Sequence, residues 1–174
     1  DDGQVLTSAG AGAAPAFEDA AGGGKIGQMV QTLKTDTFST TSTSATAVTG
    51  LSVNITPVAT SSKVLILVNF GSFNSRYGSN YIYATISGGN AATYIGDAAT
   101  GHEVAVGTLS PGADNYSQSS GSMMYLDSPS TTSEVTYQVN IWGPAYTMLI
   151  NKPYTTRTTS YNAASTIVAM EVLA

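Results

Sequence analysis

KVLILVNF, residues 63–70, and TIVAMEVL, residues 166–173, are the two segments that decide the fold. Both are rich in β-branched and other large apolar side chains, which favour β-strands. Apolar residues fall on nearly both faces of each segment, and strands of this kind are covered on both faces. One face would pack in the core of a sandwich. Another copy of the chain is a candidate for the second cover.

Two other segments alternate between apolar and polar residues, which is the pattern of a strand with one buried face. Residues 51–56 read LSVNIT and are followed by Pro57. Residues 135–142 read VTYQVNIW and are followed by Gly143 and Pro144. Because proline and glycine interrupt strands, both segments are predicted as half-buried strands with defined ends.

Shorter runs of the same character predict further strands. They are Ile26–Lys34, Asn80–Ser87, Ala92–Asp97, Glu103–Leu109, Gly121–Leu126 and Thr147–Asn151. No window combines the helical apolar period with capping residues. Short strands joined by loops of about 5–15 residues are typical of sandwiches and barrels. We therefore predict an all-β domain over residues 25–174, an antiparallel β-sandwich with a jelly-roll-like topology.

Residues 1–24 differ from the rest of the chain. Alanine and glycine make up more than half of them, and Val5, Leu6 and Phe17 are the only sizeable apolar side chains. This is too little apolar surface to offset the entropy of ordering the segment on its own. The sequence therefore predicts an extended Gly/Ala-rich N-terminal arm or linker ahead of the sandwich.

The chain carries few charges and has an acidic balance. Charged residues make up 10% of the 174 residues, against about 25% in an average globular protein. Six basic and eleven acidic side chains give a formal charge of −5, which repels phosphate backbones and anionic lipid surfaces. No apolar run reaches the roughly 20 residues of a membrane span. We expect no nucleic-acid partner and no membrane insertion.

Side chains suited to catalysis or metal binding are scarce. His102 is the one histidine and there is no cysteine, so a zinc site, which needs several such ligands, is not expected. A serine triad would depend on the same histidine. Asp97, Glu103 and Asp114 lie near glycines but lack the spacing of a calcium loop. Bound calcium stays open as an alternative, because carboxylates and backbone carbonyls suffice to hold it. We predict no enzyme activity, no metal site and no cofactor.

Binding is the alternative to catalysis, because the chain has ten tyrosines. Tyrosine supplies rigid amphipathic contact area, and Asn, Ser and Thr add adaptable hydrogen bonds, a mixture suited to glycan or protein receptors. Residues 71–80 and 143–164 are the polar stretches that contain such side chains. The candidate receptor-binding residues are Arg76, Tyr77, Tyr146, Tyr154, Arg157 and Tyr161. The alternative is that these rings pack on neighbouring strands or at subunit contacts.

Two stretches resemble parts of tailed-bacteriophage virion proteins. Gly3–Phe17, GQVLTSAGAGAAPAF, is similar to a linker-like block of tail-fibre and other virion proteins, where it often precedes a receptor-facing or oligomerisation domain. Lys25–Lys63, KIGQMVQTLKTDTFSTTSTSATAVTGLSVNITPVATSSK, resembles the opening of C-terminal β-domains in similar phage proteins. In those domains a strand, a Ser/Thr-rich hairpin and a turn lead into an apolar strand.

The resemblance implies a structural protein on the virion surface, a homotrimeric tail-fibre component that takes part in host attachment. Its partners would be other virion proteins and a glycan or protein receptor on the host. Two alternatives stay open: a capsid decoration or head-fibre protein, and a carbohydrate-binding module of a bacterial surface or secreted protein. The residues themselves favour an oligomer, since apolar faces need covers and a slender Gly/Ala segment can run beside its copies along a symmetry axis.

Overall fold

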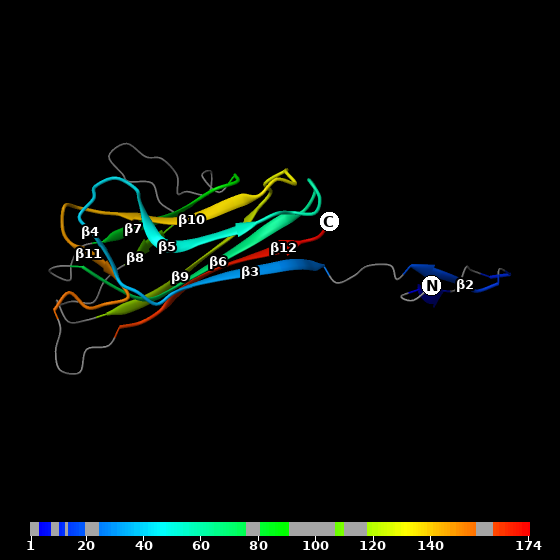
Figure 1. Ribbon diagram of the computed structural model, residues 1–174, viewed down its shortest axis with the longest axis horizontal. Helices are drawn as coiled ribbons and strands as arrows, with labels where there is room; N and C mark the ends of the chain where they lie inside the picture. The colour runs from blue at the N-terminus through cyan, green and yellow to red at the C-terminus, as the bar shows by residue number, and fades with distance from the viewer. Residues whose placement is uncertain are drawn as a thin grey trace.

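The computed structural model describes residues 4–7, 11–12, 14–19, 25–75, 81–90, 107–109, 118–155 and 162–174 (Figure 1). Within these residues the chain forms twelve β-strands, and no helix there is long and apolar enough to cross a membrane. The strands are β1 (Gln4–Thr7), β2 (Ala16–Asp19), β3 (Ile26–Lys34), β4 (Phe38–Thr40), β5 (Thr46–Ile55), β6 (Lys63–Ser75), β7 (Ile82–Ser87), β8 (Gly107–Leu109), β9 (Ser119–Asp127), β10 (Val135–Trp142), β11 (Met148–Ile150) and β12 (Ser165–Val172).

Ten of the strands form two antiparallel sheets that lie one over the other (Figure 1). The four-stranded sheet has the order β5-β10-β7-β8. The six-stranded sheet has the order β3-β12-β6-β11-β4, with β9 paired to β6. The chain passes repeatedly between the layers, so that β3-β12-β6-β9 faces β5-β10-β7-β8. Two four-stranded layers connected in this way form a jelly roll, which confirms the predicted fold class.

The core lies between the layers and is built from alternate residues of each strand. In β6, Val64, Ile66 and Val68 are buried, and Ile82 and Ile86 of β7 belong to the same apolar cluster from the opposite layer. Burying one such aliphatic side chain contributes about 1.5–3 kcal/mol. The two-residue period of the sequence therefore sets which side chains hold the layers together.

Several of the strands expected from apolar patterning are present in the described residues. Residues 26–34 and 135–142 form β3 and β10 with the expected bounds. The run at 63–70 continues as far as Ser75, and the run at 166–173 is shifted by one residue in β12.

Other strand predictions are only partly testable. Gly121–Leu126 and Thr147–Asn151 correspond to β9 and β11. Ala92–Asp97 lies outside the described residues, and of Glu103–Leu109 only residues 107–109 are described, as β8. The short strand β4 was not predicted, because three residues show no clear alternation.

The N-terminal segment contains a short hairpin that sequence patterning did not predict. Strands β1 and β2 pair in antiparallel register, with Leu6 opposite Phe17, and both of these side chains are exposed. Gly12, between the strands, has a φ of 88°, a left-handed conformation that glycine adopts without steric cost. In Figure 1 this hairpin stands apart from the sandwich.

Candidate functional site

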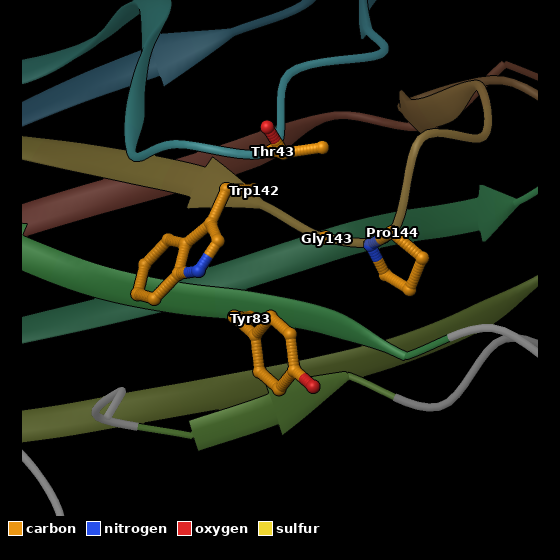
Figure 2. A pocket seen from close by; sticks show the side chains of 5 residues that line it. All are labelled: Thr43, Tyr83, Trp142, Gly143 and Pro144. Atoms are coloured by element: carbon orange, nitrogen blue, oxygen red, sulfur yellow. The ribbon is translucent and has the colours of Figure 1, made fainter. Parts of the chain in front are cut away.

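A small recess opens where β10 leads into β11, at one end of the four-stranded sheet (Figure 2). Its volume is about 240 Å³ and it is lined by Thr43, Tyr83, Trp142, Gly143 and Pro144. Pockets for drug-sized ligands begin at about 300 Å³. The recess therefore has room for one small group, such as a single sugar ring.

Two aromatic rings form the main walls of the recess. Trp142 is the last residue of β10 and pairs directly with Tyr83 of β7. Their ring centroids lie 5.6 Å apart with an angle of 37° between the planes. Trp142 is buried and Tyr83 is partly exposed, so the tyrosine ring presents most of the contact surface. Aromatic rings with a polar tip suit ligands that have both apolar and hydroxyl faces.

The loop from β4 to β5 closes the recess from the other side (Figure 2). The amide of Gly143 donates a hydrogen bond of 3.2 Å to the carbonyl of Ser42. The Ser42 hydroxyl donates to the carbonyl of Ser44 at 2.6 Å and accepts from the Ser44 amide at 3.1 Å. These bonds fix the loop that carries Thr43, whose exposed side chain forms the rim.

Gly143 is required by the packing beneath the recess. A Cβ atom at this position would lie 2.8 Å from the sulfur of Met148 and 2.9 Å from the carbonyl oxygen of Tyr81. Real Cβ atoms almost never approach other atoms this closely, so any larger residue would displace the start of β11 or the strand that carries Tyr83. The Gly-Pro pair that marked the end of a strand in the sequence thus also shapes the site.

The structure places two of the six predicted receptor-binding residues. Tyr146 follows the recess directly, and its amide donates a 2.5 Å hydrogen bond to the carbonyl of Pro144. Its ring is exposed, whereas Tyr154, in the segment after β11, is partly exposed. The other four predicted residues lie outside the described residues: Arg76, Tyr77, Arg157 and Tyr161.

Neither main wall of the recess was among those predicted residues. Trp142 did carry a signal, because it occupies a position of β10 where the alternation calls for a polar side chain. An aromatic ring at such a position lies on the outer face of its sheet. Its pairing with Tyr83 depends on the register between β10 and β7, which sequence periodicity alone does not set.

Two acidic side chains of the sandwich lie in its interior. Asp127 and Glu171 are fully buried between the layers, where a substrate would not reach them. The described part of the chain holds no group of three or more His, Cys, Asp or Glu side chains arranged for a metal ion. Asp97, His102, Glu103 and Asp114 fall outside the described residues.

The outer face of the four-stranded sheet, next to the recess, is polar. The Asn140 amide donates to the Ser87 hydroxyl at 2.9 Å, and Gln138 donates to the carbonyls of Val48 and Leu51 at 3.1 Å each. These bonds run across neighbouring strands and satisfy the side chains within the sheet. The surface beside the aromatic recess is thus polar and uncharged, with the amide groups of Gln138 and Asn140 bonded within their own sheet.

The fold and the recess define a jelly-roll β-sandwich with a small aromatic site at one end. No family model matches the chain, and no curated protein matches it. Two solved structures are similar over 98% of this chain. One is a chain of infectious bursal disease virus, Gx strain, with 13% identity and a TM-score of 0.40, and the other is from the Gt strain, with 12% and 0.36. This chain spans 45% and 47% of their lengths. Likeness at this level carries no inference about function.

Proposed function

We propose that this chain is a structural protein of a tailed-bacteriophage particle, a trimeric tail-fibre component that contacts the host surface. The proposed role is non-enzymatic and lies at the virion surface, with other virion proteins as neighbours. The proposal starts from the resemblance of Gly3–Phe17 and Lys25–Lys63 to virion proteins. It is supported by the positions of the N-terminal arm and the aromatic recess at the two ends of the sandwich.

The observation that carries the proposal is that the arm and the recess belong to opposite ends of the sandwich. The amide of Leu173 donates a 2.8 Å hydrogen bond to the carbonyl of Lys25, so β3 starts beside the C-terminus. Register places Val135 opposite Ile55 near that end, and β10 runs from there to Trp142 at the far end (Figure 1). A fibre anchored through its N-terminal arm would therefore point the recess away from the particle.

The recess suggests the class of receptor. Its walls are aromatic and its rim carries hydroxyls, with no charged side chain among its lining residues. A neutral aromatic site of this size fits a sugar ring, which packs an apolar face on an aromatic side chain and hydrogen-bonds through its hydroxyls. We therefore propose a glycan of the host surface as the ligand.

Immunogold labelling of particles that encode this chain tests the location. Antibodies raised against the purified protein should mark the tail or its fibres. Gold on the head would instead support a capsid decoration or head-fibre protein, and particles without gold would contradict a virion role altogether. Light scattering of the purified protein across a dilution series should give the mass of three chains, and a stable monomer would contradict the trimeric fibre.

A carbohydrate-binding module of a bacterial protein is the second candidate, because the same aromatic recess would serve it. That reading requires sugar binding by a monomer or dimer and no association with phage particles. The labelling and the light scattering together therefore separate it from the fibre component.

A further inference from the structure

The outer face of the layer formed by β3, β12, β6 and β9 is apolar. One row of outward side chains crosses all four strands in register, with the members Met29, Met170, Leu65 and Leu126. The next outward row is Gln31, Val168, Leu67 and Met124. Met29 is 64% exposed and Met124 is 60% exposed, so the rows are open to solvent in the single chain.

This face lacks the charge that the chain has elsewhere. Over residues 26–34, 63–69, 119–127 and 165–172, Lys63 is the one charged side chain that points outward, at a corner of the face. The acidic residues of these strands, Asp127 and Glu171, are buried on the inner side. Because the chain carries a net charge of −5, two copies repel each other in general. They can meet here without bringing carboxylates together.

The opposite outer face gives the contrast. There the polar side chains of Gln138 and Asn140 bond to their own sheet, and Thr136 is exposed. A sandwich that only had to stay in solution would have two such faces. The difference between the layers therefore indicates that the apolar one is covered.

The size of the face suits a subunit contact. Four strands and seven residues along each span about 19 by 24 Å at ordinary strand spacings, or about 450 Å² in projection. Apolar patches on monomers seldom exceed about 300–600 Å². The projected area lies within that range and amounts to a little more than half of the roughly 800 Å² per partner of a standard interface.

The face combines an exposed apolar edge on β3 with a hollow over the other three strands. On β3, Met29 and Leu33 protrude, with exposed fractions of 64% and 57%. Over β12, β6 and β9, a hollow of about 450 Å³ is lined by Leu67, Met124 and Val168 together with neighbouring residues of these three strands. Because the exposed edge of β3 and the hollow are different parts of one face, they fit a head-to-tail contact, which closes into a ring when copies repeat it by rotation.

We propose that this face is the interface between copies of the chain, with β3 of one subunit seated in the hollow over β6 and β9 of the next. That the assembly contains three subunits rests on the proposed fibre function. A ring about an axis along the strands gives every subunit the same direction. All arms then leave from one end and all aromatic recesses point to the other.

Cysteine cross-linking tests this contact directly, because the chain contains no cysteine. Positions 29 and 124 lie on β3 and β9, three strand spacings (about 14 Å) apart across the sheet and two residues (about 7 Å) apart along it, too far for a disulfide within one chain. In the full-length protein, the double variant Met29→Cys/Met124→Cys should form covalent trimers under oxidation. Each single variant should stay uncross-linked. Monomers only from the double variant, or dimers from Met29→Cys alone, would overturn the arrangement.

Charge insertion provides an independent test. Met29→Glu and Met124→Glu each place an unpaired charge in the interface and should weaken association by about tenfold or more. Thr136→Glu, on the polar outer face, is the matched control and should associate as the wild type does. Circular dichroism and thermal unfolding establish that each variant folds. Folded glutamate variants with unchanged mass by light scattering would refute the interface.

The two proposals fail in different ways. Covalent trimers from a protein that labels no phage particle would leave the interface standing and remove the virion role. A virion protein whose trimer survives both glutamates would keep its role and lose this interface.

Discussion

The phenol of Tyr137 donates a 2.6 Å hydrogen bond to Oδ2 of Asp127, and both residues are fully buried. Tyr137 belongs to β10 of the four-stranded sheet and Asp127 ends β9 of the other layer. The bond therefore ties the two layers together through the core. The same carboxylate oxygen accepts the amide of Asn90 at 3.1 Å, which adds the turn after β7 to the link.

Removing this phenol should destabilise the sandwich. Tyr137→Phe leaves a buried carboxylate with one donor fewer, and a lost partner of this kind costs about 1–3 kcal/mol. Chemical unfolding followed by tryptophan fluorescence should show a lower midpoint with an unchanged slope. Tyr81→Phe, on an exposed ring just before β7, is the comparison variant. A Tyr137→Phe protein as stable as the wild type would mean that the link contributes nothing.

The same tyrosine should make the fold sensitive to alkali. Burial raises the pKa of Tyr137 well above its ordinary value of 10.0, and the Asp127 carboxylate raises it further. The stabilisation is thus fully present below pH 10 and declines above it, because the unfolded chain loses this proton more readily than the folded one. The free energy of unfolding should fall between about pH 10 and 11 in the wild type, and less steeply in Tyr137→Phe.

Glu171 should make the fold sensitive to acid. Burial by itself raises the pKa of this carboxyl group, but hydrogen bonds from the Val58 amide (2.7 Å) and the Gln28 side chain (3.2 Å) help to outweigh it and lower the pKa below 4.5. The resulting stability is present above pH 4.5 and is lost as the pH falls through the folded-state pKa. Melting temperatures at decreasing pH should drop more steeply in the wild type than in Glu171→Gln. Parallel curves would exclude this carboxylate as the cause.

Asn151 should stabilise the recess end of the sandwich, because its side chain links its own segment to two others. Its side-chain amide donates to the carbonyls of Lys34 (2.9 Å) and Asp36 (3.1 Å), and its oxygen accepts the Ser165 hydroxyl at 2.6 Å. Its φ of 65° is left-handed, which asparagine and glycine tolerate. Asn151→Gly should lose about 2–3 kcal/mol from these bonds, and Asn151→Ala about 1 kcal/mol more from backbone strain. Equal stabilities of the two variants would show that strain plays no part.

Glycan binding should depend on the aromatic recess. Tyr83→Ala removes the more accessible wall and should abolish binding on a glycan array while the protein keeps its melting temperature within a few degrees. Tyr81→Ala removes an exposed ring two residues away that does not line the recess, and should bind as the wild type does. Equal loss in both variants, or an array without hits for the wild type, would argue against the recess as a receptor site.

The sequence by itself determined the fold class and most of the strands. The alternation in residues 135–142 fixed which side chains of β10 enter the core, since neighbouring side chains of a strand point to opposite faces. The sequence likewise showed that residues 63–70 and 166–173 have apolar side chains at outward positions. In the structure these positions lie side by side on the exposed face. These features are local, so periodicity is enough to reveal them.

Only the tertiary structure decided which side chains from distant segments come into contact. The register that sets Trp142 beside Tyr83, and the loop that brings Thr43 over them, arise from contacts between segments far apart in the chain. Likewise, Tyr137 reaches Asp127 only because the layers stack. Strand pairing and layer packing are settled by long-range burial, which leaves little trace in the pattern of any one strand. The hairpin of β1 and β2 remained unforeseen because its few apolar residues carry too weak a local signal.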